Sequence, residues 1–215
     1  MFKTILGGLG ARWVSQDRGA YGAETELRLA PDVPEVKVDV ETKGIEHWTV
    51  FEGRWTVEPM PGAPDGKRVL VQRATSSTFN VIVAPPGPYT DVDVSARFYP
   101  ISGRKDASGG IVFRFADGTY YVVRANALED NFRLYAYERD RRQLASATVK
   151  KPALAQWHAL RVVAVGDRTQ AWLNGALLLD HRGARCRSGR VGFWTKADSV
   201  TAFDGLSIRG VAASG

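Results

Sequence analysis

The sequence predicts an all-β protein built as a two-sheet antiparallel β-sandwich. Short runs rich in Val, Thr, Tyr, Phe and Trp recur from Val36 onward, and Gly, Pro, Asn and Asp separate them. No segment shows a helical period of adequate length. Antiparallel strands without helices bury their apolar faces against a second sheet, so two stacked sheets are expected.

The strands expected in the sandwich follow one another at short intervals. In chain order they lie at residues 36–41, 48–53, 54–59, 68–73, 79–84, 90–100, 109–116, 119–126, 132–139, 145–150, 157–166, 169–175, 176–181, 190–196 and 201–209. Asp117-Gly118 and Asn174-Gly175 are the strongest hairpin signals. Alternation within 90–100 places Val92 and Phe98 on one face and the acidic Asp91 and Asp93 on the other.

The chain is expected to divide into three parts. Residues 1–34 form an N-terminal extension, because the apolar residues alternate poorly there, glycines are frequent and the segment ends in Pro31 and Pro34. One strand is expected inside it, at residues 25–30. The sandwich domain covers residues 35–210, and residues 211–215 form a C-terminal tail.

Charge and cysteine content restrict the possible partners. The net charge is +6, mostly from arginine, but no nucleic-acid motif accompanies it, so we expect solvated arginines and no nucleic-acid partner. The single Cys186 excludes an internal disulfide and a multi-cysteine metal site. The first apolar run is too short to span a membrane, and no membrane partner is expected. The location is extracellular or periplasmic if a leader has been removed and otherwise cytoplasmic, and the oligomeric state stays open.

Several segments together resemble a known group of domains. The stretches "GGIVFRF", "YYVVRANALEDNFRLY", "WHALRV", "LNG" and "GFWTKADS" are similar to bacterial concanavalin A-like, laminin-G-like jelly-roll domains. The likeness is closer to the group related to the 3-keto-disaccharide hydrolase domain, and it extends over about Val36 to Arg209. It implies a concanavalin A-like jelly roll. Lectins, glycan-binding appendages and polysaccharide hydrolases share that fold, so the fold does not choose among them.

A polar cluster within this resemblance is the predicted glycan site, on the concave face of the jelly roll. Arginine, asparagine and carboxylate groups hydrogen-bond to vicinal hydroxyls, and an exposed aromatic ring, here Trp194, packs on a sugar ring. The predicted ligand-binding residues are Arg114, Arg124, Asn126, Glu129, Asn131, Trp194, Lys196 and Asp198. The structural alternative is that Asn126 and Asp130 close a turn while Arg124 pairs with Glu129.

Three other interpretations accompany the lectin-like one. A calcium ion is possible at Glu129, Asp130 and Asp198, because hard cations take carboxylate oxygens. A hydrolase similar to the 3-keto-disaccharide hydrolases would use the same carboxylates as acid, base or metal ligand, whereas Asp91 and Asp93 are expected on a solvated face. A protein-interaction domain is the third. We predict a glycan-binding module without chemistry of its own.

Overall fold

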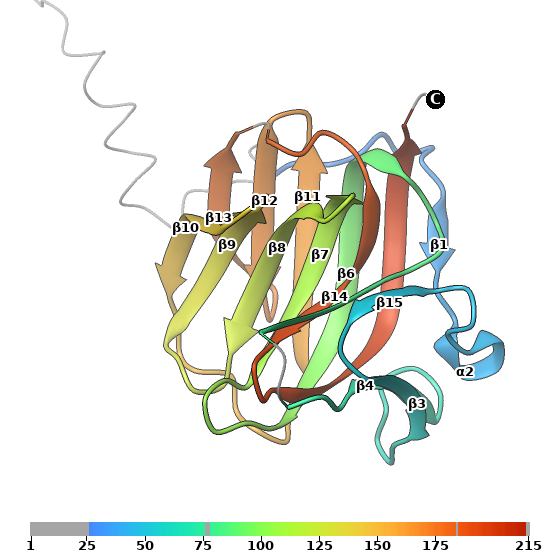
Figure 1. Ribbon diagram of the computed structural model, residues 1–215. Coiled ribbons are helices and arrows are strands. Elements are labelled where there is room, and N and C mark those ends of the chain that lie inside the picture. Colours follow the sequence, from blue (N-terminus) through green and yellow to red (C-terminus); the bar gives the residue numbers. More distant parts are fainter. Residues whose placement is uncertain (1–25, 76–77, 184, 214–215) are drawn as a thin grey trace, which may run out of the picture.

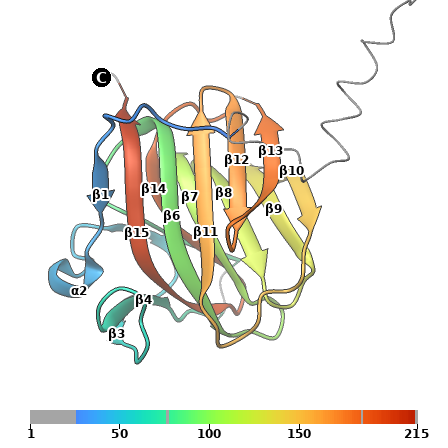
Figure 2. The same ribbon diagram turned by 180° about the vertical axis from the view of Figure 1, so that it is seen from behind.

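The computed structural model describes residues 26–75, 78–183 and 185–213, and these form two antiparallel sheets packed face to face. Figure 1 shows the seven-stranded sheet in front, and Figure 2 shows the eight-stranded sheet from behind. The predicted two-sheet sandwich is therefore confirmed. Within the described residues, the structure contains no helix long and apolar enough to cross a membrane.

The eight-stranded sheet has the order β13-β12-β11-β6-β15-β4-β3, with β1 beside β15. Its strands are β1 (Glu35–Lys37), β3 (Trp55–Pro59), β4 (Arg68–Gln72), β6 (Tyr89–Ser102), β11 (His158–Val165), β12 (Arg168–Leu173), β13 (Ala176–Arg182) and β15 (Val200–Ala212). The other sheet has the order β10-β9-β8-β7-β14-β5-β2. Its strands are β2 (Thr49–Glu52), β5 (Phe79–Val83), β7 (Ser108–Ala116), β8 (Thr119–Asn126), β9 (Asn131–Tyr137), β10 (Arg141–Thr148) and β14 (Arg190–Lys196).

Within the sandwich domain, the strand predictions hold with one exception. The segment 36–41 was expected as a strand, but the chain leaves the sheet after Lys37 and forms the short helix α2 (Val40–Lys43). Asp39 caps this helix, since its carboxylate accepts a hydrogen bond of 3.0 Å from the backbone N–H of Thr42. Each other strand predicted for the sandwich domain overlaps an observed one.

The core lies between the sheets and follows the predicted alternation. Val92 and Phe98 of β6 are fully buried, and Phe203 of β15 stacks on Phe193 of β14 with ring centroids 4.3 Å apart. Gly109 of β7 lies against Phe98, and a Cβ there would come within 2.5 Å of that ring. The sheets therefore pack closely enough that β7 requires glycine at this point.

The described end of the N-terminal extension lies on the eight-stranded sheet (Figure 2). The backbone N–H of Leu27 donates to the side-chain oxygen of Gln170 at 2.7 Å, and the Arg209 guanidinium donates to the carbonyl of Ala30 at 2.8 Å. Residues 26–30 form no strand, contrary to prediction, and residues 1–25 lie outside the described part. Strand β15 continues to Ala212, beyond the predicted boundary at residue 210.

We predict that Phe203→Ala lowers the free energy of unfolding by about 3–5 kcal/mol, because it removes a ring stacked between the sheets and leaves a cavity. Phe51→Ala is the control: this side chain is 46% exposed, so the loss should be much smaller. Chemical denaturation of both variants measures the difference. Equal losses would contradict the assignment of Phe203 to the core.

Candidate functional site

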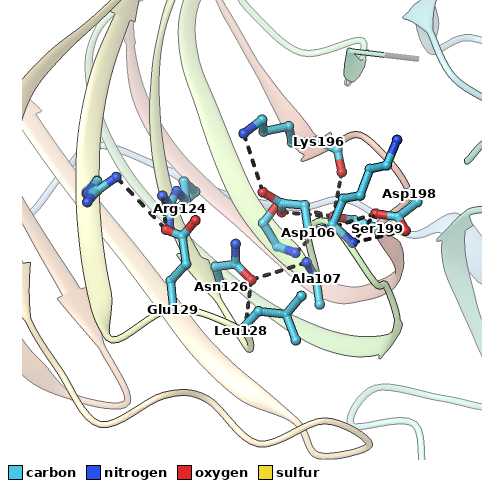
Figure 3. A network of polar contacts seen from close by, with 12 residues as sticks. Asp106, Ala107, Arg124, Asn126, Leu128, Glu129, Lys196, Asp198 and Ser199 are labelled. Carbon is cyan, nitrogen blue, oxygen red and sulfur yellow. Dashed lines mark hydrogen bonds and ion pairs between the residues drawn. The ribbon is translucent and has the colours of Figure 1, made fainter. Parts of the chain in front are cut away.

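The segment 127–130 is the turn that joins β8 to β9, as predicted. Asn126, which is fully buried, closes it: its side-chain Oδ1 accepts hydrogen bonds from the backbone N–H groups of Ala107 at 3.1 Å and Leu128 at 2.9 Å. Figure 3 shows both bonds. Asn126 thereby connects the turn to the residue that precedes β7, and its primary role is structural.

Arg124 and Arg133 lie side by side on the outer face of the seven-stranded sheet. They are register partners in β8 and β9. Arg124 Nη2 donates to Glu129 Oε2 at 2.7 Å, and Arg133 Nη1 lies 3.9 Å from the same oxygen. The Tyr135 hydroxyl accepts from Arg124 at 3.4 Å and from Arg133 at 3.2 Å. We call Arg124, Glu129, Arg133 and Tyr135 the arginine cluster. The Arg124–Glu129 pair, which the sequence offered as the structural alternative to a ligand site, is present.

Four buried polar atoms, two in this cluster and two beside it, have no hydrogen-bond partner among the described residues. They are Arg124 Nη1, Asn126 Nδ2, Asn131 Oδ1 and Arg133 Nε. A buried polar group without a partner costs about 1–3 kcal/mol, and its presence in a folded protein calls for an explanation such as a bound molecule. The four atoms come from the turn-proximal ends of β8 and β9, so the unmet hydrogen-bonding capacity is concentrated at one place.

An aromatic surface continues from the cluster across the same face. Arg141 links the two, since its guanidinium carbon lies 4.7 Å from the ring centroid of Tyr135 and 5.5 Å from that of Phe79. Beyond Phe79 lies a cleft of about 420 Å³, which we call the aromatic cleft. Its aromatic lining consists of Phe51, Phe79, Phe115, Tyr120 and Tyr137.

The prediction of Trp194 as an exposed stacking platform is wrong. Trp194 is only 1% exposed and packs beneath Phe79, with ring centroids 5.6 Å apart. Phe51 is 46% exposed and lies 4.3 Å from the ring centroid of Phe115, so it provides an accessible ring that the sequence analysis did not single out. Phe79 of the neighbouring strand β5 covers the indole, which sequence periodicity alone does not show.

Arg114 does not join the cluster. It is 2% exposed, lies near the other end of β7, and donates to the carbonyls of Thr90 at 2.8 Å and Gly166 at 2.9 Å. Its Nη2 also lies 3.4 Å from Asp91 Oδ1. Its Nη1 donates to the carbonyl of Cys186 at 3.3 Å. The guanidinium therefore ties together backbone segments from three parts of the chain, and we assign it a structural role.

Asp198 and Lys196 lie on the opposite side of Asn126 from the cluster (Figure 3). The Asp198 carboxylate accepts from the backbone N–H groups of Arg104 at 2.9 Å and Asp106 at 3.0 Å, which holds the connection between β6 and β7. Lys196 Nζ lies 3.8 Å from Asp106 Oδ2. The carboxylate of Asp198 is thus engaged by backbone donors instead of being directed toward Glu129.

The predicted calcium ligands are not gathered by the fold. Glu129 is paired with arginines, Asp198 binds backbone N–H groups, and Asp130 is exposed on the turn. In the part of the chain that the structure describes, no group of three or more His, Cys, Asp or Glu side chains is arranged to hold a metal ion. A calcium ion stays a prediction.

The carboxyl groups of Glu129 and Asp198 are both held in the ionised state. Burial opposes ionisation of Glu129, but the hydrogen bond and charge of Arg124 keep its pKa below the ordinary value. Burial likewise opposes ionisation of Asp198, and the backbone N–H groups of Arg104, Asp106 and Lys105 keep its pKa low. Carboxylates of this kind suit ligand binding or structure better than they suit general-acid catalysis.

A second cleft, of about 560 Å³, lies on the outer face of the eight-stranded sheet. Arg161 borders it, stacks over Trp172 at 4.7 Å and forms two hydrogen bonds to Asp93, of 2.9 and 2.8 Å. Asp93 and Asp91 therefore serve as arginine partners and are not simply solvated, which corrects the prediction for them. The four unpartnered buried atoms lie on the other sheet, and for that reason we place the candidate site there.

Arg133, Tyr135 and Arg141 were missed by the sequence analysis. The signal for two of them was present, because alternation along "FRLYAY" places Arg133, Tyr135 and Tyr137 on the face that Arg124 shares. Arg141 follows in the next strand and is the register partner of Tyr137. The contacts with Phe79 join strands far apart in the sequence and had no local signal.

Comparisons with known proteins agree with the fold. No family model matches the sequence, and a search of curated proteins found no match. The carbohydrate-binding module CBM66 from Bacillus subtilis has a similar structure, with a TM-score of 0.66, 17% identity, and 76% of this chain and 96% of that chain covered. The Emp46p carbohydrate recognition domain, in its metal-free form, gives a TM-score of 0.57, 10% identity and coverage of 82% and 94%. The cellulose-induced protein Cip1 gives a TM-score of 0.58 and 15% identity, with 84% of this chain and 99% of that chain covered.

At these identities the similarity shows the fold alone. Together with the two-sheet arrangement, it shows that the chain has a jelly-roll sandwich of the concanavalin A-like type, an architecture found in proteins named as carbohydrate-binding.

We predict that Asn126→Ala destabilises the protein by about 1–3 kcal/mol, because two backbone N–H groups lose their acceptor. Asn131→Ala, at the other end of the turn, should cost less, since its Oδ1 has no partner among the described residues and its side-chain hydrogen bond to Glu129 involves a partly exposed carboxylate. Thermal or chemical unfolding measures both. A larger loss in Asn131→Ala would contradict the role given to Asn126.

The lowered pKa of Glu129 predicts an acid-sensitive contribution to stability. The ion pair stabilises the fold above the ordinary pKa of 4.5, and this contribution is lost as the pH falls through the lowered pKa of the folded state. The stability difference between wild type and Glu129→Gln should therefore be greatest near neutral pH and shrink in acid. Urea unfolding over a pH series measures it, with the exposed Glu46→Gln as control. A constant difference would contradict the prediction.

Proposed function

We propose that this protein is a carbohydrate-binding module that recognises a glycan on the outer face of its seven-stranded sheet. The observation that carries the proposal is the set of unpartnered buried atoms, Arg124 Nη1 and Arg133 Nε among them, next to a continuous aromatic surface. Saccharides present hydroxyl groups that accept and donate hydrogen bonds, together with apolar ring faces that pack on aromatic rings.

The geometry supports two different kinds of contact with a sugar at the two ends of this face. The arginine cluster supplies hydrogen-bond donors at one end, and the aromatic cleft, with the ring of Phe79 at its edge, supplies apolar contact at the other. Arg141 connects them through its contacts with Tyr135 and Phe79. A cleft of about 420 Å³ is within the usual size of small-ligand sites, and the names of CBM66 and the Emp46p domain support the same class of ligand.

A hydrolase similar to the 3-keto-disaccharide hydrolases is the alternative. Such an enzyme needs an acid with a raised pKa and a base that converge on one pocket. Glu129 and Asp198 have lowered pKa values instead. Burial raises the pKa of Asp204, but this residue belongs to β15 of the other sheet, and its oxygens accept from Asp65 and Gly205 N–H groups. These facts favour binding over hydrolysis.

We predict that wild type binds a subset of glycans on an array and that the double variant Phe79→Ala, Arg133→Gln loses about tenfold or more in affinity, since it removes a ring contact and a donor. Arg97→Gln is the matched control: Arg97 is an exposed arginine on the other sheet and should leave binding unchanged. Circular dichroism checks that each variant is folded. Unchanged binding by the double variant would place the glycan elsewhere, and an array without any bound glycan would contradict the proposed function.

A further inference from the structure

The arginine end of the candidate site carries an excess of positive charge, whereas the aromatic cleft at the other end includes Glu52. Arg124, Arg133 and Arg141 lie on one face, and both ion pairs recorded there involve a single carboxylate, that of Glu129. Arg141 is positioned over the rings of Tyr135 and Phe79. Three guanidinium groups beside one carboxylate leave a local charge that a neutral sugar would not balance.

Glu129 occupies the place where an anion would bind to these arginines. Its Oε2 lies 2.7 Å from Arg124 Nη2 and 3.9 Å from Arg133 Nη1, so it bridges the two guanidinium groups. Arg124 has a side chain only 4% exposed, whereas the Glu129 side chain is 36% exposed, so the carboxylate covers the arginine from the solvent side. Figure 3 shows Glu129 beside Arg124 at the turn.

Arg124 and Arg133 nevertheless retain N–H donors that Glu129 does not engage. Arg124 Nη1 and Arg133 Nε are buried and have no partner within the described residues. A guanidinium binds a carboxylate best through two parallel N–H donors, but Glu129 engages Arg124 through one nitrogen. The internal carboxylate is therefore an incomplete partner for this site.

We infer that the glycan is acidic and that a sugar carboxylate replaces Glu129 between Arg124 and Arg133. This inference rests on the proposed function, because it names the ligand class of the same site. A neutral hydroxyl in place of Glu129 would leave a desolvated guanidinium without a counter-charge, whereas a ligand carboxylate preserves the charge balance and reaches the spare donors. Glu129 comes from the turn 127–130 and not from a strand, so it can move aside without breaking the sheet.

The test is calorimetric titration of the full chain with two acidic probes, oligogalacturonate and sialyllactose, which distinguish a uronic acid from a sialic acid. Each is paired with its neutral counterpart, namely the carboxyl-reduced oligosaccharide and lactose. We expect at least one acidic probe to bind about tenfold or more tightly than its counterpart. Arg133→Gln should remove most of this preference, and Arg97→Gln should retain it.

Glu129→Gln provides the sharpest outcome, because it removes the competing carboxylate. It should tighten binding of the acidic probe severalfold and leave a neutral probe unaffected, whereas a merely structural role for Glu129 would weaken both. Glu46→Gln, an exposed glutamate outside the site, controls for the charge change.

Equal affinity for acidic and neutral probes, or weaker acidic binding by folded Glu129→Gln, would overturn the inference. If neutral glycans on the array bind this face while the acidic probes bind no more tightly than their neutral counterparts, the result supports the proposed function and contradicts the acidic ligand class. If no saccharide binds at all, both fail.

Discussion

The face-to-face packing of the two sheets is the constraint on which the other features depend. Phe193 and Phe203 stack across the interface, and Gly109 lets Phe98 approach β7 closely. Because side chains alternate along a strand, this packing commits Val123 and Ala125 of β8 to the core, and Arg124 must then point outward. The position of the arginine cluster is thus a consequence of the core packing. A register shift of β8 by one residue would turn Arg124 into the core and would disrupt both the core and the cluster.

The outer face of the seven-stranded sheet departs from the usual polar surface of a sandwich. Residues such as Val122, Tyr120 and Trp194 are buried there in a second apolar cluster, so the central strands are apolar on both faces. This second cluster supports the half-buried rings of Phe79 and Tyr137 at its margin and holds guanidinium groups against Tyr135. An apolar surround weakens the competition from water, which makes every hydrogen bond to a ligand in this place stronger.

Glu129 reconciles the structural and the functional interpretations of the cluster. Its pair with Arg124 stabilises the ligand-free turn, as in an ordinary salt bridge between neighbouring elements. The same pair preserves a desolvated guanidinium in a form that a ligand can engage, because a buried arginine without any counter-charge would be costly. The two roles do not conflict, since the first concerns the free protein and the second concerns the proposed complex.

The sequence by itself determined most of the strands and the turn at 127–130, and it offered the Arg124–Glu129 pair as an alternative, because alternation, turn chemistry and a separation of five residues are local properties. It also indicated the jelly roll through its resemblance to known domains. Only the tertiary structure decided that Trp194 is covered by Phe79, that Arg114 binds distant carbonyls, and that Arg141 reaches Phe79. These contacts join strands that are distant in the chain, and they depend on sheet order and register, which no local pattern specifies.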